Sequence, residues 1–263
     1  MKTPKILVGC PVSEYHAYCT DEYLARAQEL SYPNYDLFLV DNSAADTFSS
    51  YLHSKGVSFV HDFATVKDIK QKIMLSRNVL RKKMLDEGYD YFLSLEQDVI
   101  PPKDLIERLL LHKKPIVSGV YYSYYPVQGK QALFPVLYRS LTGQEKTNMQ
   151  ANLPLLQQVN PDLHTTLTKN NFDFSAVRVK LKPEEVEAPR LMTVKQIGLG
   201  CVLIARAVLE KIPFRVDATN NTYDDALFCD DAQGYALFVD TAVKCKHLLE
   251  KRPWTWKELD AKA

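Results

Sequence analysis

The chain has 263 residues and a formal net charge of +1; 46% of its residues are hydrophobic and 25% are charged. This composition is ordinary for a soluble globular protein, and the small net charge argues against a nucleic-acid-binding protein that relies on a broad basic surface. The length allows one large domain or two small ones, and no apolar run approaches the roughly 20 residues of a membrane-spanning helix.

The five cysteines indicate the compartment. Cys10, Cys201 and Cys245 lie in apolar stretches, which favours reduced, buried thiols over a disulfide framework. The apolar residues 5–10 are too short for a signal peptide and end at Pro11. We therefore expect a cytoplasmic protein. A peripheral membrane contact stays open, although no helix with a marked basic face is evident.

Strands and helices alternate over the first 120 residues. Apolar runs predict strands at 6–10, 35–40, 57–60, 91–98 and 116–120. Helices are expected at about 21–30 with Thr20 as N-cap, 46–55, from Thr65 to about Gly88, and 103–112. This alternation predicts an α/β domain with a mainly parallel central sheet, whose ligands bind at the carboxyl ends of the strands.

The later chain divides into three parts. Residues 121–195 begin with the aromatic cluster Tyr121–Tyr125, continue through a Gln-, Asn- and Thr-rich stretch, and are interpreted as an irregular insertion. The core resumes over 196–250, with strands near 196–204 and 235–239 and a short helix at 206–211. Residues 251–263 form a tail that contains both tryptophans. We therefore expect one domain over 1–263.

Two acids follow the strand that begins at Tyr91. On an extended backbone Glu96 and Asp98 share a face, and adjacent carboxylates are costly unless positive charge lies near them. A divalent cation would satisfy both, whereas two solvated loop acids are the simpler alternative. His247 follows a strand-like run and is a candidate third ligand that would shift the preference toward Mn²⁺; alone, it would be an ordinary surface or core histidine.

Two further polar residues stand at informative places. Asp41 ends an apolar strand, so it either caps the turn at 42–44 or accepts a hydrogen bond from a base or ribose. Arg77 falls on the apolar face of the helix that starts near Thr65, where a guanidinium needs a partner. That partner is a structural ion pair, a nucleotide, or the acids at the edge of the sheet.

Four acids, Asp224, Asp225, Asp230 and Asp231, lie within eight positions. They suit either a solvated loop or a site in which one carboxylate is a general base, with its pKa raised by its acidic neighbours.

In this order, the segments resemble the GT-A-fold glycosyltransferases of the family 2 kind. The matching segments are 6–12, 39–46, 76–78, 91–102, 197–201, 224–229, 234–235 and His247. The resemblance covers about 1–120 and 196–250, and it implies a Rossmann-like central sheet flanked by helices. It also implies a metal-dependent, inverting transfer of a sugar from a nucleoside-diphosphate sugar to a hydroxyl of a glycan, lipid or protein glycan.

The resemblance also implies residue roles. The donor nucleotide would contact Pro11, Val12, Ser13, Asp41, Arg77 and Gln97. The metal, Mn²⁺ or Mg²⁺, would be held by Asp98, Glu96 and His247, the base would be Asp225 or Asp224, and the acceptor side would include Gly198, Gly200 and Asp231. Two features depart from the family pattern. Glu96 replaces the first Asp of the metal motif, and the segment from Asp225 to Gly234 is short, which leaves the choice among the four acids open.

Two other functions compete with this one. A nucleotidyltransferase acting on a sugar phosphate would usually carry a Gly-rich basic loop near its N-terminus, and residues 10–13 are not one. A non-catalytic relative that only binds a nucleotide sugar or glycan would not need the acids and His247 in order. The tyrosines at 121–125 and the tryptophans Trp254 and Trp256 suit packing better than stacking on an acceptor sugar.

Overall fold

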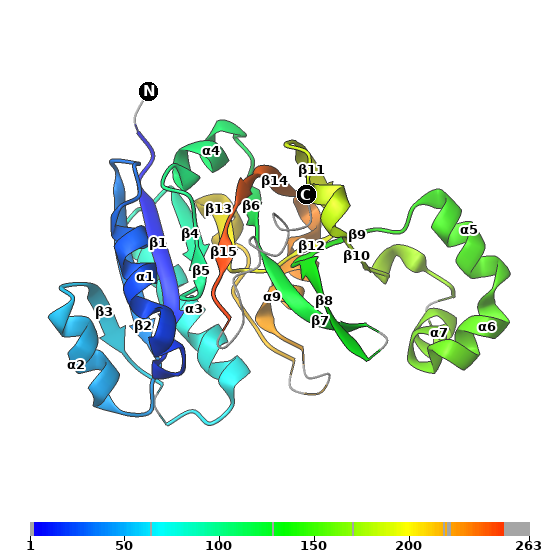
Figure 1. Ribbon diagram of the computed structural model, residues 1–263, viewed down its shortest axis with the longest axis horizontal. Coiled ribbons are helices and arrows are strands. Elements are labelled where there is room, and N and C mark those ends of the chain that lie inside the picture. The colour runs from blue at the N-terminus through cyan, green and yellow to red at the C-terminus, as the bar shows by residue number, and fades with distance from the viewer. Residues whose placement is uncertain are drawn as a thin grey trace.

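An eight-stranded mixed sheet forms the centre of the protein (Figure 1). The computed structural model describes residues 3–249 except 64, 128, 170, 218, 220 and 221, so Trp254 and Trp256 lie outside the described residues. The strand order is β11-β14-β6-β13-β4-β1-β2-β3. The strands of this sheet are β1 (Ile6–Val12), β2 (Tyr35–Asp41), β3 (Ser58–His61), β4 (Tyr91–Leu95), β6 (Ile116–Val120), β11 (Leu191–Val194), β13 (Cys201–Ala205) and β14 (Leu237–Lys244).

The expected mainly parallel sheet is confirmed. Its parallel pairs are β1–β2, β1–β4, β2–β3 and β6–β14, whereas β13 is antiparallel to both neighbours and β11 is antiparallel to β14. Because β13 and β14 come from the later part of the chain and lie beside β4 and β6, residues 1–120 and 196–250 share one sheet.

Helices cover both faces of the sheet. One face packs against α1 (Ala17–Gln28), α2 (Asp46–Ser54) and α4 (Leu105–Leu111). The other packs against α3 (Ile69–Asp86), α8 (Arg206–Leu209) and α9 (Asp224–Asp231). Successive residues of β1 point to opposite faces of the sheet. Val8 belongs to the apolar core on the side of α1, α2 and α4, and Leu7 belongs to the core on the side of α3, α8 and α9. None of the helices in the described part of the chain is long and apolar enough to cross a membrane.

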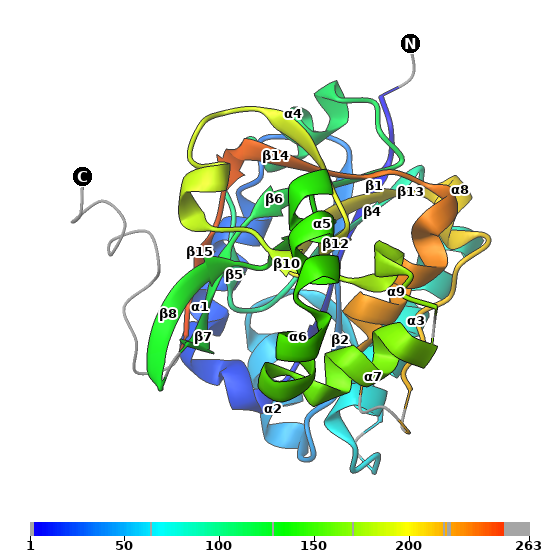
Figure 2. The same ribbon diagram turned by 90° about the vertical axis from the view of Figure 1, so that its right-hand side faces the viewer.

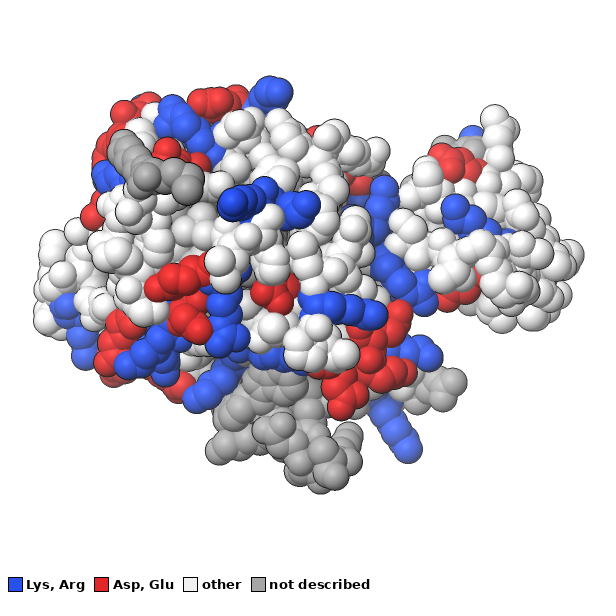
Figure 3. Space-filling view, turned by 90° about the horizontal axis from the view of Figure 1, so that it is seen from above, with Lys and Arg blue, Asp and Glu red and all other residues white. Residues whose placement is uncertain are grey.

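The insertion contains more regular structure than its sequence suggested. Its strands are β7 (Tyr122–Val127), β8 (Lys130–Pro135), β9 (Leu137–Arg139) and β10 (Val179–Lys180), and its helices are α5 (Gly143–Ala151), α6 (Leu153–Val159) and α7 (Pro161–Lys169). The three helices stand apart from the sheet in Figure 1 and lie in front of it in Figure 2. They pack around a small apolar cluster of Leu141, Leu167 and Phe174. Seen from above, acidic and basic side chains are interspersed, as the small net charge predicts (Figure 3).

Two helix starts differ from the expectation. Helix α1 begins at Ala17, and Thr20 lies inside it, where its hydroxyl donates to the carbonyl of His16 (3.1 Å). Helix α3 begins at Ile69 rather than near Thr65, because Asp68 is the N-cap and accepts a hydrogen bond from the amide of Gln71 (2.8 Å).

The strand expected over 91–98 is also shorter. Strand β4 ends at Leu95, and residues 96–98 form a turn closed by a hydrogen bond from the amide of Val99 to the carbonyl of Glu96 (2.9 Å). A short ladder between β5 (Val99–Ile100) and β15 (Lys246–His247) follows this turn, and β12 (Gln196–Ile197) pairs with β9. The inference that Glu96 and Asp98 share a strand face was therefore wrong, because a turn sets their directions.

Replacing Gly9 with Ala should lower the free energy of unfolding by about 1–3 kcal/mol. An added Cβ would lie 2.5 Å from Cε2 of Phe92 and 2.9 Å from Cδ2 of Leu80, where β1 packs closely on α3. Urea denaturation measures the change. Gly143→Ala is the control, because nothing lies within 4 Å of its new Cβ. An unchanged urea midpoint for Gly9→Ala would contradict this close packing.

Candidate functional site

Two adjoining cavities lie at the carboxyl ends of the central strands. The first, the loop cavity, has a volume of about 480 Å³ and is bounded by residues 11–16, 42–44 and the turn at 96–98. The second, the helix cavity, has a volume of about 240 Å³ and is bounded by the start of α9 and by β7. Ile73, Arg77 and Glu96 line both cavities, so these three side chains form a shared wall.

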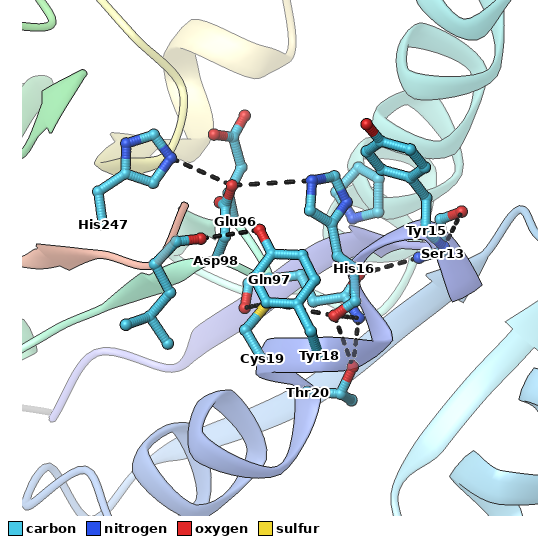
Figure 4. Close-up of polar contacts among 12 residues, drawn as sticks. Ser13, Tyr15, His16, Tyr18, Cys19, Thr20, Glu96, Gln97, Asp98 and His247 are labelled. Carbon is cyan, nitrogen blue, oxygen red and sulfur yellow. Dashed lines mark hydrogen bonds and ion pairs between the residues drawn. The ribbon is translucent and has the colours of Figure 1, made fainter. Parts of the chain in front are cut away.

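Asp98 and His247 meet at one oxygen atom. Nε2 of His247 lies 3.1 Å from Oδ2 of Asp98, while Nδ1 donates a hydrogen bond to the carbonyl of Tyr122 (2.6 Å), which fixes the orientation of the ring. Pairing of β15 with β5 holds the two residues together. The ring of His16 approaches the same oxygen from the other side, at 3.8 Å (Figure 4).

The contact between Asp98 and His247 affects the pKa of each group more than burial does. Burial alone would raise the pKa of Asp98, but the hydrogen bond and charge of His247 hold this pKa below its ordinary value. Burial alone would lower the pKa of His247, but Asp98 raises it above the ordinary value. The pair therefore favours a carboxylate beside an imidazolium when nothing else is bound.

Arg77 binds two acids at once. Its Nη1 donates to both carboxylate oxygens of Asp224 (2.7 Å each), and its Nη2 donates to Oε1 of Glu96 (2.5 Å). Arg77 is 2% exposed, so this contact is shielded from water. Burial raises the pKa of Glu96 to about 7, although Arg77 acts in the opposite direction. Of the partners that the sequence left open for Arg77, the structure shows the acids.

The four clustered acids now separate into distinct roles. Asp224 binds Arg77, Asp230 pairs with Arg178, and Asp231 accepts two hydrogen bonds from Arg215 (2.6 and 2.7 Å). Asp225 lines the helix cavity and, within the described part of the chain, has no ion pair. Burial and the negative charge of Asp224 raise the pKa of Asp225 above its ordinary value.

Negative charge accumulates between the cavities. Glu96, Asp98, Asp224 and Asp225 gather here, and among the described residues they outnumber the basic groups that contact them, which are Arg77, His247 and His16. Clustered acids in excess of their counter-charges favour binding of a cation.

Asp98 and His247 fit a divalent cation. Neighbouring ligands of an octahedral ion at about 2.1 Å lie about 3 Å apart, and the observed separation of 3.1 Å agrees with this. The expected third ligand, Glu96, is held by Arg77 instead. No group of three His, Cys, Asp or Glu side chains that could hold a metal is present among the described residues. Two side chains are thus spaced as metal ligands would be, and substrate phosphates commonly complete sites with few protein ligands.

Gln97 holds the loop after β1 in place. Its Oε1 accepts from the amide of Ser13 (2.9 Å), and its Nε2 donates to Oγ1 of Thr20 (2.6 Å) and to the carbonyl of His16 (3.3 Å) (Figure 4). Pro11, Val12 and Ser13, which the resemblance assigns to the donor nucleotide, line the loop cavity beside Gln97.

Asp41 lies behind the cavity wall. Its oxygens accept from the amide of Ser43 (2.9 Å) and from Oγ of Ser49 (2.6 Å), and its side chain is fully buried. Asn42 and Ser43 line the loop cavity in its place. These contacts favour the turn cap that the sequence left open for Asp41.

The expected acceptor-side residues do not line either cavity. A Cβ on Gly198 would lie 2.0 Å from the hydroxyl of Tyr121, and one on Gly200 would lie 2.8 Å from Oε2 of Glu96. Both glycines therefore make room for neighbouring side chains, and the amide of Gly200 donates to the hydroxyl of Tyr121 (3.1 Å). Asp231 is held by Arg215 at the far end of α9.

Sequence reasoning missed His16 and Tyr223, and for Tyr121 it favoured packing over contact with an acceptor sugar. His16 faces Asp98, and Tyr121 and Tyr223 line the helix cavity. His16 could have been found from its place in the loop directly after β1. Tyr223 precedes the acidic motif, but its exposure of 48% depends on how α9 docks, which the sequence does not encode locally.

No protein-family model matches the sequence, and no curated protein matches it either. Among solved structures, the mannosyltransferase PcManGT from Pyrobaculum calidifontis, in complex with GDP-Man and Mn²⁺, aligns with a TM-score of 0.55 and 14% identity. The alignment covers 97% of this chain and 59% of PcManGT. The chain has the GT-A fold.

Two further structures align over 95% of this GT-A chain. A197 from STIV has a TM-score of 0.46, 13% identity and 88% of its own length covered. S. aureus TarS has a TM-score of 0.48, 12% identity and 36% of its own length covered. This chain therefore spans a little over half of PcManGT and about a third of TarS.

Replacing Asp225 with Asn should stabilise the protein at pH 7. The pKa of Asp225 is raised on folding, so its ionisation in the folded state costs stability as the pH rises through the unfolded and folded pKa values. Asn removes this cost, and the gain should disappear near pH 4. Thermal unfolding between pH 4 and pH 8 measures the difference.

Asp231→Asn is the matched control for this effect, because it removes an acid of α9 that has an ion pair. It should not stabilise the protein at any pH. Equal melting temperatures of Asp225→Asn and the wild type at pH 7 would show that ionised Asp225 is not under strain.

Proposed function

We propose that the protein is a metal-dependent, inverting glycosyltransferase that moves a sugar from a nucleoside-diphosphate sugar to a hydroxyl acceptor. The observation that carries this proposal is the placement of Asp98 and Asp225 on two cavities that share a wall. The GT-A fold supports it, as does the complex of PcManGT with GDP-Man and Mn²⁺.

The loop cavity suits the donor. Its wall combines the backbone of residues 11–13 with the side chains of Asn42, Lys67 and Lys72. The ammonium of Lys72 donates to the carbonyl of Asn42 (2.9 Å), which places a positive charge beside the polar wall. Lysine charges favour a diphosphate. Gln97 orders the loop that carries residues 11–13.

Asp98 and His247 would hold Mn²⁺ or Mg²⁺, and the imidazole favours Mn²⁺. When bound, the ion supplies Lewis-acid stabilisation of the negative charge on the departing diphosphate. His247 is held for this purpose by the carbonyl of Tyr122.

Asp225 acts from the helix cavity. Its carboxylate accepts the proton of the acceptor hydroxyl, and its raised pKa makes it a better base than an ordinary aspartate. Because the helix cavity adjoins the loop cavity at Arg77 and Glu96, an acceptor in the helix cavity would attack the sugar from the side away from the leaving diphosphate. One displacement then inverts the anomeric carbon.

The acceptor would be a glycan or a lipid-linked glycan. The helix cavity offers the aromatic rings of Tyr121 and Tyr223 and the hydroxyl of Ser123 beside Asp225, which suits a polar ring with an apolar face. We place the reaction in the cytoplasm, since the five cysteines are free and buried.

Replacing Asp98 with Ala should weaken Mn²⁺ binding by at least about 100-fold and abolish turnover, because one of two protein ligands is lost. Calorimetric titration with Mn²⁺ and hydrolysis of nucleotide sugars measure these two effects. Asp240→Ala is the matched control, because Asp240 also pairs with a histidine, His112, at 2.7 Å but away from both cavities. Full activity of Asp98→Ala would end the metal proposal.

Replacing Asp225 with Asn should lower kcat by roughly 10²–10⁴-fold while donor KM changes little, since a general base acts only in the transition state. Steady-state transfer kinetics with a saturating acceptor measure both constants. Asp104→Asn, at the start of α4 on the other face of the sheet, should leave both unchanged. A change in KM alone would remove Asp225 from the role of base.

A further inference from the structure

The strongest polar contact outside the reacting groups is the bridge that Arg77 forms. It joins α3 to the turn at 96–98 through Glu96 and to the start of α9 through Asp224. The exposed side-chain fractions are 3% for Arg77 and 2% for Asp224. The Asp224 end is therefore buried, whereas the side chain of Glu96 is 34% exposed, and both ends are charge-assisted hydrogen bonds with a defined direction.

The site has two acidic motifs, Glu96 with Asp98 and Asp224 with Asp225, and in each motif one carboxylate binds Arg77 and the other does not. In the turn at 96–98, Glu96 binds Arg77 and Asp98 faces the loop cavity. At the start of α9, Asp224 binds Arg77 and Asp225, which has no ion pair among the described residues, faces the helix cavity. All four acids line a cavity, but only one member of each motif, Glu96 or Asp224, is bound to the guanidinium of Arg77.

We propose that Glu96 and Asp224 are positioning residues, and that Arg77 links them into one bridge that fixes Asp98 and Asp225 relative to each other. This inference rests on the proposed function for the roles of Asp98 and Asp225 and goes beyond it. In this arrangement Glu96 is not a metal ligand, Asp224 is not the base, and Arg77 does not contact the donor.

An arginine is required at this position. The guanidinium is planar and carries donors on both terminal nitrogens, so one side chain can hold two carboxylates in fixed directions. A lysine would keep the charge but would act as a point charge, and it could not hold both acids in this geometry. Because each acid lies within two residues of a reacting group, a small rotation at either end of the bridge moves Asp98 or Asp225.

The experiment uses Arg77→Lys, Asp224→Asn and the double variant in the full-length protein. Each single change should lower kcat by about 100-fold, because reacting groups displaced by about 1 Å lose rate on this scale. Affinity for Mn²⁺ alone and for GDP or UDP alone should stay within about threefold of the wild type. The double variant should be no slower than the slower single variant, as expected for residues that act as one unit.

Arg215→Lys is the matched control. Arg215 also binds an acid of α9, Asp231, with two hydrogen bonds, but it lies outside both cavities. Its kcat should equal that of the wild type. Glu96→Gln should retain Mn²⁺ binding, in contrast to Asp98→Ala.

Three results would each overturn the bridge. A weakened affinity of Arg77→Lys for GDP or UDP with kcat retained would make Arg77 a donor contact. Loss of Mn²⁺ binding in Glu96→Gln would make Glu96 a metal ligand. Additive losses in the double variant would make the two residues independent.

A measurement that does not need turnover separates this inference from the proposed function. Arg77→Lys and Asp224→Asn should both speed hydrogen exchange of the amides at 224–231, and Arg215→Lys should not speed exchange at the start of this helix. Unchanged exchange at 224–231 in Arg77→Lys contradicts the bridge even in an inactive protein. A wild type that binds neither Mn²⁺ nor a nucleotide contradicts the proposed function instead.

Discussion

The site depends on the burial of more negative than positive charge beside one guanidinium. Glu96, Asp98, Asp224 and Asp225 lie together at the end of the sheet, and Arg77 is held between two of them. Removing one partner of such a buried pair leaves an uncompensated charge and is strongly destabilising. The remaining excess makes the cavity edge attractive to a cation. Burial, together with the negative charge of Asp224, raises the pKa of Asp225.

The fold could be predicted from the sequence to a large extent. Alternating apolar runs and helix signals indicated the α/β class and a mainly parallel sheet, and both are confirmed. The errors lie where a distant contact overrides a local signal. Thr20 looked like an N-cap, but its hydroxyl is used by Gln97 and His16, and the helix starts earlier. The insertion could not be assigned because its three helices pack mainly on one another.

The site was predicted in its membership more than in its contacts. The pairing of Asp98 with His247 joins residues 149 positions apart, and the ordered motifs led to it. The sequence predicted that Glu96 and Asp98 lie on one strand, but β4 ends at Leu95. The direction of the Glu96 side chain therefore could not be predicted. The division of labour among the acids of α9 depends on Arg77, Arg178 and Arg215, which come from separate elements. No local pattern encodes such partners.

The position of β13 has a consequence for how the chain acquires its structure. This strand lies between β4 and β6, although about 80 residues separate it from β6 and about 105 from β4 in sequence. During synthesis, β4 and β6 therefore leave the ribosome long before β13, which pairs with both. The edges of β4 and β6 that face β13 stay unpaired until β13 has been made. Such non-local pairing slows folding and exposes edges to aggregation. The folding chain must therefore close a loop that contains the whole insertion before the two halves of the sheet become continuous.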